Sequence, residues 1–261
     1  MWAQAEIGLQ FLMLKTKIKI SKASIYQFKS FFHLNFLNEG ITSTYIDKVK
    51  LSKISDILDN SSLKSLEIVH YNSAPSIIPV KFYDKDMKAK YLETNTDFVN
   101  NLEEDISTDQ KIAVVYSKNK DLSNTLSLDK QNTTHVNHFT QLYNYLDGVI
   151  DNSDGLSFFI KISSESFEII IFNKNEFVFF NTFEIVDENE FLYYTFFVLK
   201  NFQRSIKKDK IIFIGRHEIF DKYYNLASKY SSIEFIEDDT HSILNFKEKF
   251  FSVINAHNIR D

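Results

Sequence analysis

The chain has 261 residues, a net charge of −5 and an isoelectric point of about 5.8. This length fits one large domain or two small ones, and the acidic balance gives no electrostatic basis for binding nucleic acid or an anionic membrane. Cysteine is absent, which excludes disulfides, thiolate metal sites and cysteine nucleophiles and suits a reducing cytoplasm. Hydrophobic residues make up 44% of the chain, so a substantial core can be buried.

The first half of the chain alternates short strand and helix patterns. Apolar residues predict strands at 10–14 and 18–28, and the apolar run 7–14 is too short to span a bilayer. The helical spacing of Ile46, Val49, Leu51 and Leu58 predicts a helix over 41–58. Further along, we expect strands at 64–71, 75–80, 111–116 and 133–138 and helices at 84–95 and 139–146.

Residues 146–155 are the best candidate for a domain boundary. Gly148 and Gly155, two of only five glycines, lie there among Asp, Asn and Ser residues, which is the composition of a loop. We therefore expect an N-terminal domain at 1–147 and a C-terminal domain at 148–261.

The second half has the clearer pattern. Apolar and polar residues alternate from residue 156, and a turn at 173–176 precedes another strand, so 156–185 is expected to form a three-stranded antiparallel meander. Strands are expected at 210–215 and 233–236, and helices at 218–230 and 242–257. The predicted core of this half includes Ile160, Ile169, Ile171, Val198 and Ile212.

A helix is expected between these strands, starting after residue 187. Asp187 and Glu190 have the spacing of a capping box, which marks a helix start. Apolar residues then occupy nearly the whole circumference, with Tyr193, Phe196 and Phe197 outside the main stripe. This distribution predicts a helix buried on two sides.

Several short motifs give the sequence a resemblance to a known family. They are Ser76-Ile77-Ile78-Pro79-Val80, Phe82-Tyr83-Asp84, Tyr91-Leu92-Glu93-Thr94-Asn95, Phe172-Asn173-Lys174-Asn175-Glu176-Phe177, Phe180-Asn181-Thr182-Phe183 and Phe191-Leu192-Tyr193-Tyr194. Over about residues 8–236 the chain resembles an uncharacterised bacterial (Bacteroidetes-type) family of unknown function with an actin-like ATPase fold of the hexokinase–actin superfamily. The resemblance implies an α/β fold of actin-like (ribonuclease H-like) duplicated halves, each a mixed β-sheet with helices.

The N-terminal half departs from this expected fold. An actin-like half has three strands before its first helix, whereas the segment before residue 41 accommodates two comfortably. We therefore expect the first strand to lie upstream of Met1, or the start codon to be misassigned.

The resemblance also implies where a nucleotide would bind. An actin-like ATPase holds Mg²⁺ and phosphates with an Asp and with backbone N–H groups of glycine-rich hairpins. The corresponding hairpins are expected at 14–18 and 162–167; neither contains glycine, and no Asp precedes the second. A candidate remnant of a nucleotide or anion site consists of Ser163, Ser164, Gly215 and Arg216. A polar hairpin and a plain strand-to-helix turn are the favoured structural interpretations of these residues.

Other polar groups are weaker candidates. His135 and His138 have HxxH spacing but no third ligand nearby in sequence, so a surface pair is favoured over a metal site. His217 and Glu218 could form an acid–base couple, although Glu218 also suits the first turn of a helix. Solvated loops are favoured over cation sites for the acidic runs 103–105 and 237–239.

This architecture without nucleotide-binding motifs favours a cytoplasmic actin-like pseudo-ATPase that acts as a protein-interaction or scaffold module. Its partner would be a protein, and neither a cofactor, nucleic-acid binding nor membrane insertion is expected.

The alternative is a divergent ATP-dependent enzyme or a filament-forming actin-like ATPase that uses ATP and Mg²⁺. A membrane-associated assembly component is a third hypothesis, which rests on fold analogy with secretion and pilus systems. Binding is expected either at the strand-end site or at the aromatic residues Tyr193, Phe196 and Phe197.

Overall fold

The computed structural model describes most of the chain between residues 20 and 236. The described residues are 20–28, 32–38, 43–59, 63–71, 73–96, 100–118, 122, 133–150, 155–163, 166–185, 187–202 and 210–236. Two compact units can be distinguished, Met1–Asn144 (unit 1) and Tyr145–Asp261 (unit 2). The domain boundary expected between 147 and 148 stays a prediction. The features expected at 10–14, 14–18, 237–239 and 242–257 lie outside the described residues.

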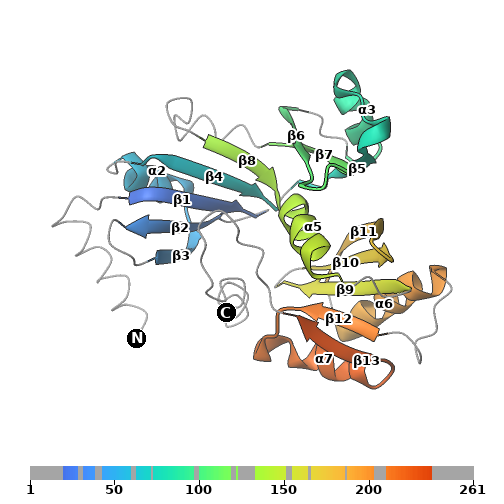
Figure 1. Ribbon diagram of the computed structural model, residues 1–261. Coiled ribbons are helices and arrows are strands. Elements are labelled where there is room, and N and C mark those ends of the chain that lie inside the picture. Colours follow the sequence, from blue (N-terminus) through green and yellow to red (C-terminus); the bar gives the residue numbers. More distant parts are fainter. Residues whose placement is uncertain are drawn as a thin grey trace. The chain divides into compact units, whose positions relative to one another are not determined.

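Unit 1 contains a five-stranded sheet in the order β3-β2-β1-β4-β8 (Figure 1). Strands β1 (Ile20–Gln27), β2 (Phe32–Asn38) and β3 (Ser43–Val49) form an antiparallel meander. Strands β4 (Ser65–His70) and β8 (Thr133–Asn137) continue the sheet in parallel with β1. Helix α2 (Leu51–Asp59) follows β3 and contributes Ile54, Ile57 and Leu58 to the core formed with Ile25, Leu34 and Ile68.

Two expectations for this region are wrong. The helix expected over 41–58 begins only at Leu51, and residues 43–49 form β3, because pairing with β2 outweighs the helical spacing of Ile46 and Val49. All three strands before α2 lie within residues 20–49, so the strand expected upstream of Met1 is not needed. The missed strand, β2, carries the period-two signal of Phe32, Leu34 and Phe36.

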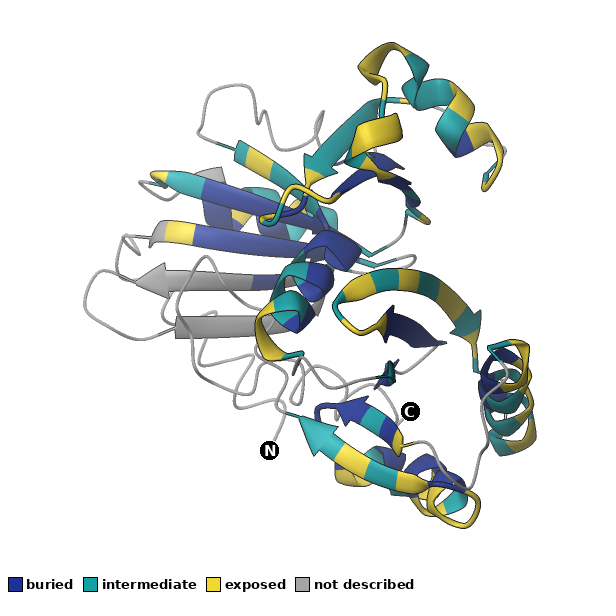
Figure 2. Cartoon of the chain, turned by 45° about the vertical axis from the view of Figure 1, so that its right-hand side comes forward, coloured by how far each residue is buried: buried dark blue, intermediate teal, exposed yellow. Residues whose placement is uncertain are grey.

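A smaller sheet in unit 1 has the order β5-β7-β6. Its strands β5 (Ser76–Pro79), β7 (Ile112–Ser117) and β6 (Leu102–Ile106) are antiparallel, and residues 112–116 of β7 are buried, as their continuous apolar run predicts (Figure 2). The short helices η1 (Val80–Phe82), η2 (Lys85–Met87) and α3 (Lys88–Glu93) follow β5. Helix α5 (His138–Val149) follows β8 and runs through the division between the units.

Unit 2 repeats the topology of the large sheet, with the order β11-β10-β9-β12-β13. Strands β9 (Leu156–Ile162), β10 (Ser166–Asn173) and β11 (Glu176–Glu184) form the expected antiparallel meander. Strands β12 (Lys210–Ile214) and β13 (Ser232–Ile236) add in parallel. Both sheets therefore place their first strand in the centre, antiparallel to the second strand and parallel to the fourth.

Helix α6 (Glu188–Asn201) and helix α7 (Asp221–Ser228), which follows η4 (Glu218–Phe220), pack with this sheet. The Asp187 carboxylate accepts hydrogen bonds from the backbone N–H groups of Asn189 (2.7 Å) and Glu190 (2.9 Å), which confirms the expected helix start. Of the predicted core, Ile160, Ile169, Ile171 and Val198 are buried, whereas Ile212 is half-buried. No helix in the described part of the chain is long and apolar enough to cross a membrane.

Replacing Phe191 by Ala should destabilise unit 2. The Phe191 ring is fully buried and meets the rings of Phe167 and Tyr223 edge-on, at 4.9 and 5.1 Å between centroids. Its loss should lower the free energy of unfolding by about 3–5 kcal/mol, because a cavity remains. Urea unfolding measures the change. The control Phe197→Ala, a half-exposed ring on the same helix, should cost less than about 1 kcal/mol, and equal costs would contradict this assignment of the core.

Candidate functional site

The duplicated sheets give the two candidate nucleotide hairpins equivalent positions. β1 ends at Gln27 and β9 ends at Ile162, and each first strand is then joined to the second by a short hairpin. The first hairpin expected at 14–18 lies outside the described residues, whereas the connection from β1 to β2 falls between Gln27 and Phe32. Neither 28–31 nor 163–165 contains glycine, and neither first strand ends in an acidic residue. Neither Gln27 nor Ile162 can therefore serve as an acidic metal ligand, and the one acidic residue in the two connections, Glu165, lies outside the described residues.

Ser163 lies directly after β9 and helps to close the β9–β10 hairpin. Its hydroxyl donates to the backbone carbonyl of Ser166 at 2.8 Å and accepts from the Ser166 N–H at 3.2 Å. This local role agrees with a polar hairpin turn. Ser164 lies outside the described residues, and a function of either serine in binding an anion stays a prediction.

Gly215 and Arg216 follow β12, the parallel neighbour of β9, so they share a sheet edge with Ser163. Gly215 has φ = 74°, which glycine adopts without strain, and its N–H donates to the carbonyl of Ile236 at 2.9 Å. The exposed Arg216 guanidinium lies over the Phe235 ring, 5.1 Å from its centroid. The candidate residues that are described therefore gather at one edge, and each has a structural contact there.

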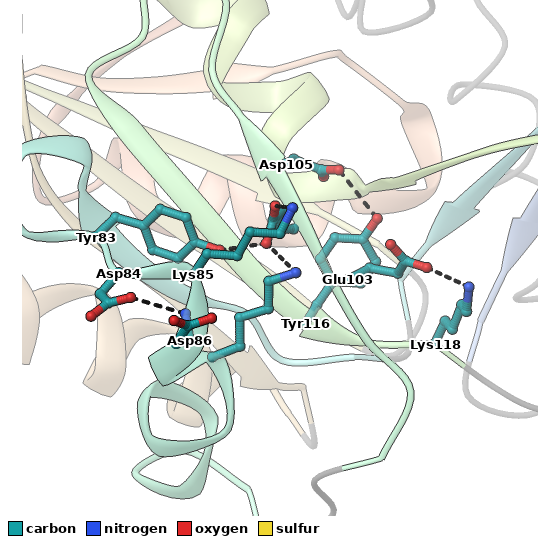
Figure 3. Close-up of polar contacts among 10 residues, drawn as sticks. Tyr83, Asp84, Lys85, Asp86, Glu103, Asp105, Tyr116 and Lys118 are labelled. Atoms are coloured by element: carbon teal, nitrogen blue, oxygen red, sulfur yellow. Dashed lines mark hydrogen bonds and ion pairs between the residues drawn. The ribbon is translucent and has the colours of Figure 1, made fainter.

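A buried acid–base cluster in unit 1 was not found from sequence. The Asp105 carboxylate accepts hydrogen bonds from the Asn137 N–H (2.7 Å), the Thr140 hydroxyl (2.8 Å) and the Tyr116 hydroxyl (3.2 Å; Figure 3). Burial raises the pKa of Asp105 to about 6, although these hydrogen bonds act in the opposite direction. Burial likewise raises the pKa of Glu67, on β4, to about 7. Both carboxyl groups are thus shifted into the range useful for proton transfer at neutral pH.

Histidines extend this cluster along β4 and β8. His70 Nε2 lies 3.0 Å from His135 Nδ1, and burial, followed by the neighbouring His135 and Lys118, lowers the pKa of His70 to about 3. His138 is also buried, with its Nδ1 3.3 Å from the His70 carbonyl oxygen. The expected surface pair of His135 and His138 is therefore wrong. Sequence alone missed His70 because 65 residues separate it from His135.

A row of buried polar side chains ends the three parallel strands of unit 1. Gln27, His70 and Asn137 are the last residues of β1, β4 and β8, and they pair with one another in register. Gln27 Oε1 and His70 Nδ1 have no hydrogen-bond partner within the described structure. Nor do the described residues contain a group of three His, Cys, Asp or Glu side chains able to hold a metal ion.

The acidic run 103–105 lies in β6, so the expected solvated loop is wrong. Glu103 pairs with Lys118 (Figure 3), and Glu104 pairs with Lys88 and, at 3.2 Å, with Lys85. Neutralisation by these lysines allows the acidic residues to occupy a strand. At the other weak candidate, His217 is buried and Glu218 is exposed, so the two side chains meet different environments.

The outer side of α6 carries an aromatic surface formed by Tyr193, Phe196, Phe197 and, from the turn that follows α7, Tyr230. Tyr193 is 62% exposed, and Phe197 and Tyr230 are each 50% exposed. Tyr193 and Phe197 stack at 6.0 Å between centroids, and Phe196 meets Tyr230 edge-on at 5.4 Å. The expectation that α6 is buried on two sides is therefore wrong: the helix has one buried and one exposed face (Figure 2).

Comparisons with known proteins agree with this architecture. The family described as "Protein of unknown function (DUF3822)" matches residues 9–233. The fold is similar to that of a Bacteroides thetaiotaomicron VPI-5482 protein with an actin-like ATPase fold and unknown function, with a TM-score of 0.68, 14% identity, and coverage of 84% of this chain and 92% of that one. It is also similar to a chain of the PilM–PilN type IV pilus biogenesis complex, with a TM-score of 0.55, 10% identity, and coverage of 91% and 95%. No curated protein matches the sequence significantly.

These likenesses confirm the expected fold. The chain has an α/β, actin-like ATPase fold, with two sheets of the same mixed topology. At identities of 14% and 10% the comparison concerns the fold alone.

Replacing Glu67 by Gln should change how stability depends on pH. The pKa of Glu67 is raised from 4.5 to about 7, so its contribution to stability is present below pH 4.5 and is lost as the pH rises through 7. Glutamine stays neutral, and Glu67→Gln should therefore be more stable than the original chain at pH 8, by about 1–3 kcal/mol, and equally stable at pH 4. Urea unfolding at both pH values measures this. Glu176→Gln, on exposed β11, is the control, and an unchanged stability of Glu67→Gln at pH 8 would contradict the buried-charge argument.

Proposed function

The chain belongs to the DUF3822 family of proteins of unknown function, and we propose that it is an actin-like pseudo-ATPase that binds another protein. The observation that carries this proposal is the exposed aromatic surface of α6 and α7. We place this interaction in the cytoplasm on the strength of the cysteine-free sequence.

Loss of ATPase chemistry is supported by the two first-strand ends. A nucleoside triphosphate carries several negative charges, and its desolvation must be offset by cations and N–H donors. Gln27 and Ile162 supply no carboxylate for Mg²⁺, and the hairpins that follow them have no glycine to let the backbone approach a phosphate. The Ser163 hydroxyl is already used within its own hairpin.

Protein binding is supported by the composition and exposure of the aromatic surface. Tyr and Phe side chains provide large contact areas with little conformational entropy to lose, and interfaces are enriched in them. Tyr193 and Phe197 are exposed and stacked on each other, and the exposed Tyr230 contacts Phe196, the neighbour of Phe197 in sequence. These aromatic side chains are more than the scattered apolar residues of an ordinary surface. A protein of similar fold occurs in the PilM–PilN complex, which supports a role in binding by analogy.

A divergent ATP-dependent enzyme is the second candidate, and the buried cluster of unit 1 favours it. Raised pKa values at Glu67 and Asp105 are typical of catalytic acids and bases. The row of Gln27, His70 and Asn137 also ends three parallel strands, which is the edge where open α/β sheets bind ligands. The two candidates differ in whether Mg-ATP binds.

Titration with Mg-ATP separates the two candidates. We expect no hydrolysis and no dissociation constant below about 1 mM, equivalent to about −4 kcal/mol, because no acidic ligand stands at either first-strand end. Isothermal titration calorimetry measures the affinity. A micromolar dissociation constant would overturn the pseudo-ATPase proposal and support the enzyme.

Variants on two surfaces show where a protein partner binds. Tyr193→Ala/Phe197→Ala should remove partner capture from a host lysate, because it deletes two exposed anchors, while the melting temperature stays nearly unchanged. Arg216→Ala should leave both capture and folding intact, at a cost within about 0.5 kcal/mol, because Arg216 is exposed. The opposite pattern, with capture lost only in Arg216→Ala, would move the binding site to the strand-end edge.

A further inference from the structure

Glu190, Tyr193, Phe197 and Lys200 form a stripe along α6. This stripe matches the same stripe of a second copy when the two helices run antiparallel. Tyr193 and Phe197 form its stacked centre. Glu190 lies three residues before Tyr193, and Lys200 lies three residues after Phe197. A two-fold axis midway between the two rings therefore exchanges the rings and brings the acidic position of one helix to the basic position of the other.

We propose that α6 packs antiparallel against α6 of a second copy of this chain, so that the pseudo-ATPase is a two-fold symmetric dimer. This inference rests on the proposed function and names its partner. Tyr193 would contact the partner subunit's Phe197, and Glu190 would pair with the partner subunit's Lys200. Two-fold symmetry creates each of these contacts twice, which is the usual geometry of a homodimer.

Charge decides between the antiparallel arrangement and a parallel one. The first turn of α6 carries Glu190 and Glu188, of which Glu188 is already paired with Lys222 at 2.9 Å, and its last turn carries Lys200. Parallel packing would bring the acidic ends together, whereas antiparallel packing pairs each acidic end with a basic end. The two helix dipoles are also aligned favourably in the antiparallel arrangement. The charges at the rim thus select one orientation around the apolar centre.

The size of the aromatic surface sets the expected strength of the dimer. An aromatic side chain buries about 150–250 Å², so three half-exposed rings supply roughly 300 Å² from each copy. A stable interface buries about 800 Å² from each partner, and the remainder must come from the polar parts of α6 and α7. We therefore expect a weak dimer with a dissociation constant in the micromolar range.

Sedimentation velocity of the full chain, from about 1 to 200 μM, tests the dimer directly. Glu190→Lys and Lys200→Glu should each be monomeric over this range, because each places like charges together across the axis. An equimolar mixture of the two variants should restore the dimer, because opposite charges then face each other at both pairs. Glu176→Lys, an exposed charge reversal on β11 away from the stripe, is the control and should leave the dimer unchanged.

Two results would overturn the inference: a chain that is monomeric at all concentrations, or a dimer that persists unchanged in both single variants. Failure of the dimer is distinct from failure of the proposed function. If the chain is monomeric and Tyr193→Ala/Phe197→Ala still loses capture of another protein, the aromatic surface serves that protein, and only the self-association is wrong. Melting curves of each variant confirm that α6 is folded.

Discussion

The central position of the first strand in each large sheet determines much of this structure. β1 and β9 are each antiparallel to one neighbour and parallel to the other, and most of their residues are buried. The parallel arrangement also brings the carboxyl ends of three strands to one edge, where ligands of open α/β sheets bind. The residue that ends the first strand therefore lies at the edge of the sheet where a ligand would be expected to bind. Here these residues are Gln27 and Ile162, and neither carries a charge.

Burial then sets the protonation of the polar groups that do lie near this edge in unit 1. Burial raises the pKa of the buried Glu67 and of the half-buried Asp105, while it lowers the pKa of His70 and favours the neutral imidazole there. The hydrogen bonds from Asn137, Thr140 and Tyr116 oppose the effect of burial at Asp105, because donors favour the ionised carboxylate. These groups thus fit an acid–base site, but they also fit a hydrogen-bonded network that only stabilises the fold. A ligand-binding measurement distinguishes the two roles.

The elements that could be predicted from sequence are those whose signal is local. The meander of β9–β11 has clear alternation and a polar turn, and the start of α6 has an Asp187 cap whose hydrogen bonds form as expected. Strand β3 was missed because Ile46 and Val49 mimic a helical period, and β6 because its acidic residues are compensated by lysines elsewhere in the chain. The contact of His70 with His135 could not be predicted, because the sheet alone brings them together.

Exposure of α6 could not be predicted for a different reason: apolar residues occupy nearly its whole circumference, and sequence does not say which side meets the sheet. The equivalent helix of unit 1 provides the comparison. α2 also follows the third strand of its sheet, and it buries Ile54, Ile57 and Leu58 while exposing Ser52 and Asp56. One apolar face is therefore enough for a helix in this position. The second apolar face of α6 is not needed for packing against the sheet. Its exposed rings have an unfavourable hydration free energy of about 25 cal/mol per Å² of apolar surface, which contact with a partner would remove. The proposed interaction with another protein surface would account for a feature of α6 that the fold does not require.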